Sequence, residues 1–347
     1  MPPDSDFSRR LLACADRLVA HLDHFERARV LVVGDLTLDE FVNCYVERIS
    51  REAPVPIIRH EHTRQVPGGG ANAIYNLAKL GAKVTAAGLV GTDAQGAALR
   101  SLFEDAHIDT AGLVAEGDRP TVTKSRISAH SRQSVTQQIV RIDRKSDDPP
   151  QAEILERLAA FVRSRAADAD AVVCSDYGDG TFTAETIAAA LTGTPCIVDA
   201  QNGLDRYRGA TWFTPNLPEA ERAVGYRVET AADLLRAGQD LLALTAAEFI
   251  LITRGDEGMS LFGRDGTVDH IPAFNRAEVY DVTGAGDTVV AGLTLCLAAG
   301  GSPWEAAVLG NLAASLVVRQ MGTATTSVTE MRDALDRLLR LHQAQMS

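Results

Sequence analysis

The chain is poor in features that mark several common protein classes. It has five cysteines among 347 residues, far apart and with no Cys-x-x-Cys pair, which argues against a zinc site and against a disulfide framework. No uninterrupted apolar run approaches the roughly 20 residues that a membrane helix requires. The first residues also lack the charged and then apolar order of a secretory signal. We therefore expect a soluble protein of the reducing cytoplasm.

Positive charge is also scarce. Lys and Arg total 34 against 46 Asp and Glu, which gives a net charge of −12 and a pI near 5.2. This sign provides no general electrostatic attraction to nucleic acid or to an anionic membrane. A small-molecule substrate is therefore favoured over either of these partners.

The composition and the hydrophobic pattern predict an α/β fold. With 46% hydrophobic and 23% charged residues, the chain can bury a large core. Apolar runs typical of buried strands alternate with helical patterns, and the sheet that they predict is doubly wound and mainly parallel, with helices on its faces. The predicted strands are Arg29–Asp35, Val84–Val90, Ala171–Ser175, Cys196–Asp199 and Phe249–Thr253.

Two stretches interrupt this alternation. Residues 42–62 and 121–143 are rich in β-branched residues and alternate partly between apolar and polar side chains. We expect them to form a small β-sheet lid that projects from the main domain. At the chain ends, apolar residues at helical spacing predict an opening helix from Phe7 to Phe25 and a closing helix that begins at a capping box of Ser327 and Glu330.

The ends of the predicted strands indicate where a ligand would bind. In a doubly wound sheet, ligands lie at the carboxyl ends of the strands. Four strand ends should therefore converge on one crevice: Gly34-Asp35, Asp176-Tyr177, Asp199-Ala200 and Thr253-Arg254-Gly255.

The strongest local signal is the segment Asp281-Val282-Thr283-Gly284-Ala285-Gly286-Asp287, which an apolar helical run follows. Glycines let consecutive backbone N–H groups face one point, and the helix dipole adds positive potential, so the segment favours an anion. Asp287 could accept a proton from an attacking hydroxyl beside a transferred phosphoryl group, or it could only cap the helix. A Walker loop and a dinucleotide fingerprint are both absent from the sequence, which leaves phosphoryl transfer by another scaffold.

From about Arg29 to Glu330 the chain resembles the phosphofructokinase-B, or ribokinase-like, family of sugar kinases. The segment that ends at Asp287 is similar to the family's carboxyl-terminal signature. Segments Gly68–Ala73 and Gly88–Gly96 are similar to its amino-terminal signature, and Asn216-x-x-Glu219 follows in the family's order. The resemblance implies one ribokinase-like domain over residues 1–347, with the lid inserted in it.

The resemblance implies a kinase that uses ATP and Mg²⁺, and it assigns roles to individual residues. Asp287 is the expected catalytic base, and Gly284, Ala285 and Gly286 form the expected anion hole over the γ-phosphate. The residues expected to contact sugar hydroxyls are Asp39, Gly68, Gly69 and Asn72. Those expected near the nucleotide are Asn216 and Glu219, which would help hold Mg²⁺ largely through water, Thr253 and Gly255 beside the phosphates, and Asn311 beside the adenine or ribose. A monovalent cation is a further candidate cofactor.

Several of these side chains also have a purely structural interpretation. Asp39 could be a turn or edge residue, and Asn72 could cap a helix. Glu219 could be a solvated acid in the first turn of a helix, and Asn311 could fill a contact between helices.

Within the family, long stretches such as Arg206–Thr211 resemble the kinases that phosphorylate C1 of D-glycero-β-D-manno-heptose 7-phosphate. These enzymes occur alone or fused to a nucleotidyltransferase, and only the kinase step is expected here. The residues then expected to bind the phosphorylated acceptor are Lys124, Arg126, Arg141 and Asp176.

Two departures from those kinases leave other readings open. They usually carry lysines where this chain has Asp179 and Gln201, and Asp179 would repel a substrate phosphate nearby. A kinase of an unphosphorylated sugar or a cyclitol is therefore a second reading. A non-catalytic binder of sugar or nucleotide is a third, against which the intact segment from Gly284 to Asp287 argues. Because unpaired lid strands would be edge liabilities, we also expect a homodimer through the lid.

Overall fold

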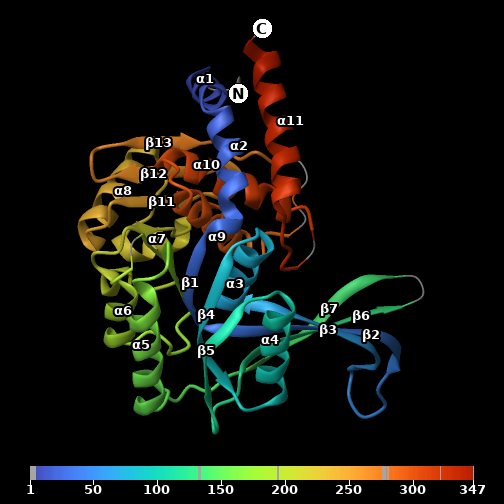
Figure 1. The fold of residues 1–347 in the computed structure, drawn as a ribbon. Helices are drawn as coiled ribbons and strands as arrows, with labels where there is room; N and C mark the ends of the chain where they lie inside the picture. Colours follow the sequence, from blue (N-terminus) through green and yellow to red (C-terminus); the bar gives the residue numbers. More distant parts are fainter. Residues whose placement is uncertain are drawn as a thin grey trace.

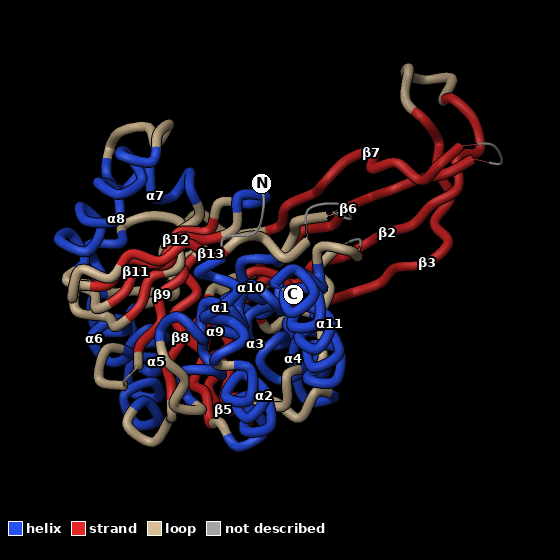
Figure 2. The backbone as a smooth tube through the Cα atoms, turned by 90° about the horizontal axis from the view of Figure 1, so that it is seen from above, coloured by secondary structure: helices blue, strands red, loops and turns tan. Residues whose placement is uncertain are grey.

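The structure is a computed structural model that describes residues 5–131, 134–193, 195–275, 279, 281–320 and 322–346. Within these residues the chain forms a nine-stranded sheet covered by helices on both faces and a four-stranded sheet, the lid, that reaches away from its side (Figures 1 and 2). The predicted α/β architecture with a projecting β-sheet is confirmed.

The large sheet contains all the predicted strands. Its members are β1 (Arg29–Gly34), β4 (Lys83–Gly91), β5 (Asp109–Glu116), β8 (Ala171–Asp176), β9 (Cys196–Ala200), β10 (Trp212–Phe213), β11 (Phe249–Thr253), β12 (Met259–Gly263) and β13 (Val268–Ile271). Their order across the sheet is β13-β12-β11-β10-β9-β8-β1-β4-β5. Neighbouring strands are parallel except where β12 pairs with β11 and with β13.

The central strand shows why these strands are apolar without interruption. Val30 and Val32 of β1 are buried in the core on one face of the sheet, whereas Leu31 and Val33 are buried in the core on the other. Both faces are covered by helices, so every side chain of such a strand must be apolar.

The helices divide between the two faces of the sheet. On the face of Val30 lie α1 (Ser5–Ala13), α2 (Ala15–His24), α3 (Gly70–Lys79), α4 (Ala94–Asp105), α9 (Ala285–Ala298), α10 (Pro303–Val317) and α11 (Val328–Met346). On the face of Leu31 lie α5 (Ala152–Ala166), α6 (Ala184–Ala190), α7 (Leu217–Val224) and α8 (Ala231–Thr245). Three short 3₁₀ segments complete the described elements: η1 (Phe25–Arg27), η2 (Leu204–Tyr207) and η3 (Gly255–Glu257). Among the described helices, none combines the length and the apolar character that crossing a bilayer requires.

The opening helix is not one helix, as predicted, but two. Cys14 separates α1 from α2 with φ −111° and ψ 10°. The bend lets the Phe7 ring pack against Trp304 and His342, while Leu18 and Leu22 are buried in the core. Apolar spacing continues through the bend, so no local pattern marks it. The closing helix is confirmed, and Ser327 and Glu330 form its capping box.

The lid strands are longer than the predicted stretches. They are β2 (Leu36–Ile49), β3 (Pro56–Gly69), β6 (Val122–Ser131) and β7 (Ser134–Arg144), in the order β3-β2-β6-β7. The prediction began at residue 42 because Leu36–Asp39 are all buried at the root of the lid. Apolar and polar side chains therefore do not alternate there as they do in a strand with one solvent-exposed face. As a result, Asp39, Gly68 and Gly69 lie on lid strands rather than in loops.

Candidate active site

Asp287 lies in the first turn of α9, at the carboxyl edge of the large sheet, and is 5% exposed. Its Oδ2 accepts a hydrogen bond from Asn72 Nδ2 at 2.7 Å, and its Oδ1 accepts one from the Tyr177 hydroxyl at 3.2 Å. Gly284 is the N-cap residue of α9 and no side chain caps it. Asp287 therefore faces a crevice between elements, and helix capping does not explain it.

The surroundings of Asp287 suit proton transfer. Burial raises its pKa to about 6, although the hydrogen bonds from Asn72 and Tyr177 act in the opposite direction. The charge of Asp39 also raises this pKa, and that of Lys124 lowers it. A carboxylate with a pKa close to neutrality is well matched to accepting a proton from a hydroxyl group near pH 7.

A chain of amide hydrogen bonds orients Asn72. Asn72 lies in the first turn of α3 and is 1% exposed. Its Oδ1 accepts a hydrogen bond from Asn76 Nδ2 at 3.1 Å, and Asn76 Oδ1 accepts one from the Thr288 hydroxyl at 3.1 Å. The bonds join α3 to α9 and aim the Asn72 amide at Asp287, so Asn72 is not a helix cap. Asn76 was missed, although a second amide four residues after Asn72 lies on the same helix face.

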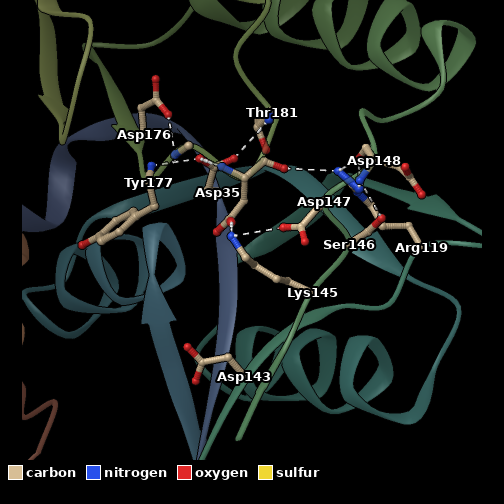
Figure 3. A network of polar contacts seen from close by, with 12 residues as sticks. Asp35, Arg119, Asp143, Lys145, Ser146, Asp147, Asp148, Asp176, Tyr177 and Thr181 are labelled. Carbon is tan, nitrogen blue, oxygen red and sulfur yellow. Dashed lines mark hydrogen bonds and ion pairs between the residues drawn. The ribbon is translucent and has the colours of Figure 1, made fainter.

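Asp35, expected in the crevice, anchors the loop that follows β8. Its Oδ2 accepts hydrogen bonds from the backbone N–H groups of Tyr177 and Asp179, at 2.8 and 3.0 Å. Its Oδ1 accepts a third, from the N–H group of Thr181, at 3.1 Å (Figure 3). Tyr177 itself had no predicted role beyond its place at a strand end, and the anchored loop is what brings its hydroxyl to Asp287.

Asp39 lies at the root of the lid and is 3% exposed. Its Oδ1 lies 2.7 Å from Nη1 of Arg126 on the neighbouring lid strand. A Cβ atom at Gly68 would lie 2.6 Å from Asp39 Oδ2, so the carboxylate can occupy this place only above a glycine. The neighbouring Gly69 has φ +53° and is the N-cap residue of α3. Asp39 is therefore a buried lid residue and not part of a turn.

The predicted lid cations share one face of the lid but differ in surroundings. Lys124 is in register with Asp39, and Arg126 is in register with Phe41 and with Arg141. The Lys124 Nζ lies 5.7 Å from the centroid of the Tyr177 ring, close to the base. Arg141 lies on the outer strand β7, where it is about half exposed and pairs with Asp143 at 2.8 Å.

Asp176 is held by protein groups. Its Oδ2 accepts a hydrogen bond from the Tyr207 hydroxyl at 2.6 Å and lies 3.4 Å from Arg206 Nη1. Its Oδ1 accepts a hydrogen bond from the Gly178 N–H group at 2.9 Å. Figure 3 shows Asp176 turned away from Asp35 and the lid. The structure therefore does not group this carboxylate with Asp39 and the lid cations.

A small acidic cavity adjoins Asp287. Its volume is about 190 Å³, and four carboxylates line it: Asp176, Asp199, Glu219 and Asp287. Burial raises the pKa of Asp199, and the charges of Asp287 and Glu219 raise it further. Burial also raises the pKa of Glu219, although Asn216 donates its backbone N–H to this carboxylate at 2.9 Å. Asn216 and Glu219 form the capping box of α7, so these two residues both begin a helix and border the cavity.

A larger cavity of about 700 Å³ adjoins the small one, and Asn216, Thr253 and Gly286 line both. Predicted residues that line it are Asn216, Thr253, Gly255, Ala285, Gly286 and Asn311, together with apolar side chains such as Phe274, Val289 and Ala314. A Cβ atom at Gly286 would meet no protein atom within 4 Å, so this glycine faces open space. The Asn311 amide donates to the Pro272 carbonyl at 2.7 Å, so it also ties α10 to the segment after β13.

Comparison with known proteins places this site in context. A family model described as pfkB family carbohydrate kinase matches residues 27–330. The bifunctional protein HldE of Geobacter metallireducens is 42% identical over 314 residues, which are 89% of this chain and 63% of that protein. The bifunctional protein HldE of Gluconacetobacter diazotrophicus is 40% identical over 313 residues, which are 88% of this chain and 63% of that protein. The chain thus spans less than two thirds of the length of these relatives.

Solved structures share the fold. Phosphofructokinase-2 of Escherichia coli, in complex with potassium, superposes with a TM-score of 0.75 at 21% identity, covering 90% of this chain and 99% of that one. Ribokinase of Arabidopsis thaliana, complexed with ribose and ATP, superposes with a TM-score of 0.67 at 22% identity and the same coverage. The predicted ribokinase-like fold is confirmed.

Proposed function

The chain belongs to the pfkB family of carbohydrate kinases, and we propose that it transfers the γ-phosphoryl group of ATP to a heptose phosphate. The acceptor hydroxyl that we propose is the one on C1 of D-glycero-D-manno-heptose 7-phosphate. The observation that carries the proposal is the buried Asp287 carboxylate, with a pKa of about 6, beside the glycine segment that begins α9. The 42% identity to a bifunctional HldE protein supports the choice of acceptor.

In the proposed reaction, the acceptor hydroxyl attacks the γ-phosphorus and Asp287 takes its proton, while the bond from the γ-phosphorus to the β,γ-bridging oxygen breaks and ADP leaves. Asn72 and Tyr177 hold the two carboxylate oxygens of Asp287, so the base meets the hydroxyl in one orientation. The anion hole that we propose is the segment Gly284–Gly286, at the positive end of the α9 dipole. Because the Ala285 N–H donates to the Val282 carbonyl at 3.2 Å, the backbone N–H groups of Gly284 and Gly286 are the ones proposed to stabilise the charge on the transferred phosphoryl group. The side chains supply position and a proton acceptor, and no covalent intermediate on the enzyme is needed.

The larger cavity is the proposed nucleotide site. Its volume of about 700 Å³ and its mostly apolar walls suit an adenine base, which stacks on apolar groups. Thr253 and Gly286 line both this cavity and the small cavity of Asp287, whereas Gly255 lines the larger cavity alone. All three would lie beside the phosphates. The open space at Gly286 is what the close approach of a phosphate to the backbone requires.

The acidic cavity fits a hydrated Mg²⁺ ion. Asp199 and Glu219 line this cavity together. Burial raises the pKa of both carboxyl groups, the charges of Asp287 and Glu219 raise that of Asp199 further, and a cation would favour the ionised form of each. Within the described part of the chain, no three acidic, histidine or cysteine side chains are grouped to hold a metal by themselves, which fits contact through water. When bound, Mg²⁺ would neutralise charge on the ATP phosphates, with Glu219, Asn216 and Asp199 around its water shell.

The lid face is the proposed acceptor site. Asp39, above Gly68, provides acceptors for sugar hydroxyls next to the base. Lys124 and Arg126 lie on the same face, with Arg141 farther out, and would bind the acceptor's own phosphate. The Asp179 carboxylate, which favoured an unphosphorylated acceptor, lies 3.7 Å from Lys145 Nζ, so its charge is compensated within the protein.

We also propose that two copies of the chain associate through their lids in the cytoplasm. The outer strand β7 exposes apolar side chains that a second copy would cover: Val135, Ile139, Val140 and Ile142. Analytical sedimentation of the wild type and of an Ile142→Lys variant tests this association. The proposal predicts a sedimenting species of lower mass for the variant. The five free, buried cysteines suit a reducing compartment.

An ATP-consumption screen tests the proposed function. The acceptors are heptose 7-phosphates, free heptoses, hexose phosphates and cyclitols, and NMR locates the new phosphate in each product. Turnover with a heptose 7-phosphate and phosphorylation at C1, both lost in Asp287→Asn, would support the proposal. Faster turnover with an unphosphorylated sugar or a cyclitol would replace the proposed acceptor while leaving the kinase assignment in place.

A further inference from the structure

The loop of residues 177–181 contacts both the catalytic base and the connections of the lid. At one end, the Tyr177 hydroxyl donates to Asp287 Oδ1. Along its length, the three backbone N–H groups of Tyr177, Asp179 and Thr181 donate to Asp35, the residue directly before the first lid strand. The Asp35 carbonyl also accepts a hydrogen bond from the N–H group of Gly70, the residue directly after β3. One residue, Asp35, therefore joins the loop through its carboxylate to the point where β2 begins, and binds the chain after β3 through its carbonyl.

The other two lid connections contact the same loop (Figure 3). Lys145 directly follows β7, and its Nζ lies 3.7 Å from Asp179 Oδ1. Arg119, between β5 and β6, donates to the Asp148 carbonyl at 2.8 Å and to the Asp179 carbonyl at 3.3 Å. Both the chain that enters β6 and the chain that leaves β7 are thus attached to residue 179.

The Lys145 ammonium group stabilises the ionised Asp179 carboxylate. The Asp179 side chain is 14% exposed, and burial together with the charge of Asp35 raises its pKa, while Lys145 lowers it. Without Lys145, only Lys124 and Arg119 would compensate Asp179 beside Asp35, and we expect the loop 177–181 to shift in response.

We propose that the Lys145–Asp179 ion pair is a positioning pair that couples the lid to the catalytic base through the loop 177–181 and the Tyr177 hydroxyl. Neither side chain of the pair need touch a substrate. The inference rests on the proposed role of Asp287 as the base. Because a displacement near 1 Å at a reacting group can lower a rate by orders of magnitude, a small shift of Tyr177 is enough to matter.

Three variants test the coupling by kinetics. Lys145→Met removes the cation but keeps the aliphatic stem, and we expect kcat to fall about tenfold with little change in the KM for ATP. The reversed pair, Lys145→Glu with Asp179→Lys, should recover kcat to within about threefold of the wild type, because the attraction is restored. Arg29→Met is the matched control, since it breaks a half-exposed ion pair with Asp170 at the opposite edge of the same sheet. An unchanged kcat in Lys145→Met, or no recovery in the reversed pair, would overturn the proposal.

Hydrogen exchange provides a readout that needs no acceptor. Lys145→Met should speed amide exchange in residues 177–181, and Asp179→Asn should speed it in residues 145–151, while Arg29→Met should leave both segments unchanged. Unaltered exchange in these segments would overturn the coupling even if the kcat of Lys145→Met fell. If the wild type phosphorylates no sugar, the proposed function fails, but the exchange experiment still decides whether the ion pair holds the loop.

Discussion

The amide of Asn72 and the carboxylate of Asp287, 215 positions apart in the chain, share a hydrogen bond of 2.7 Å. The bond crosses the contact between the first turns of α3 and α9, where each side chain taken alone could have been a helix cap. Instead, each side chain binds the other, with the remaining Asp287 oxygen bound by Tyr177. Burial makes the ionised form of this carboxyl group costly in free energy. Interactions with a bound ligand would offset that cost.

The first prediction concerns turnover. Asp287→Asn keeps the size of the side chain but cannot accept a proton, so kcat should fall at least about 10²-fold. Binding of ATP, measured by calorimetry, should remain close to that of the wild type, because Asp287 does not line the cavity that we propose for the adenine. Nearly normal turnover would show that Asp287 is not the base.

The second prediction is that the same variant is more stable than the wild type at high pH. Folding raises the pKa of Asp287 from 3.8 to about 6, so between these values the folded chain holds a proton that the unfolded chain releases. The stability of the wild type therefore falls as pH rises through this window and stays lower above it. At about 1.4 kcal/mol per pKa unit, Asp287→Asn should gain roughly 2–3 kcal/mol of relative stability between pH 4 and pH 8.

Urea unfolding without nucleotide at pH 4, 6 and 8 measures this gain. The other titrating groups are common to both proteins, so the difference between variant and wild type isolates Asp287. A difference that is the same at all three pH values would mean that folding does not perturb this carboxyl group.

The third prediction uses the pH profile of the reaction. The Tyr177 hydroxyl lowers the pKa of Asp287, so Tyr177→Phe should raise this pKa and move the acidic limb of kcat/KM to higher pH. Tyr226→Phe is a suitable control, because it removes a hydrogen bond from a tyrosine to Asp240 at the surface, far from the base. A profile of Tyr177→Phe that coincides with that of the control would exclude Tyr177 from the site.

The fold could be predicted from the sequence because its signals are local. Buried parallel strands such as β1 are uninterrupted apolar runs, and the capping box at Ser327 marks a helix start without reference to the rest of the chain. The bend at Cys14 could not be predicted, since it depends on where Phe7 finds aromatic partners. The inner ends of the lid strands were also missed, because burial of both faces at the root removes the alternation on which a strand prediction rests.

The site could be predicted in part. The glycine segment and Asp287 are neighbours in the chain, so the motif could be recognised in the sequence, and the structure places it at a crevice. Contacts between residues far apart in the chain could not be predicted in this way. That Asp35 would bind three backbone N–H groups of a loop more than 140 positions away has no local signal. That Lys145 would lie beside Asp179 has none either, and so Asp179 looked like an uncompensated anion.

The fourth prediction separates stability from function at Gly286. A Cβ atom there meets no protein atom within 4 Å, so Gly286→Ala should fold normally and gain up to about 1 kcal/mol from helix propensity. The methyl group would instead occupy space that the proposed phosphate needs, and kcat should fall about tenfold or more. Gly117→Ala, which also adds a methyl group in open space, is the control. Unchanged kinetics together with a raised Tm would place the phosphate elsewhere.

The last prediction concerns the acceptor. Asp39→Asn removes the charge that would bind two sugar hydroxyls and that pairs with Arg126, but it keeps the side chain's size above Gly68. A lost charge-assisted hydrogen bond costs roughly 1.5–3 kcal/mol, which is about 10- to 150-fold for one bond, so the KM for the acceptor should rise at least about tenfold. The KM for ATP should change little.

The matched control for Asp39 is its neighbour on β2. Glu40 points to the opposite face of the lid, where its carboxylate accepts hydrogen bonds from Gln65 and Ser125, so Glu40→Gln should leave both KM values near those of the wild type. Loss of the ion pair alone is assessed with Arg126→Gln. If that variant reproduced the whole effect and the double variant added nothing, Asp39 would act by holding Arg126 rather than by binding the sugar. Equal weakening of ATP and acceptor by Asp39→Asn would mean that this carboxylate supports the root of the lid instead.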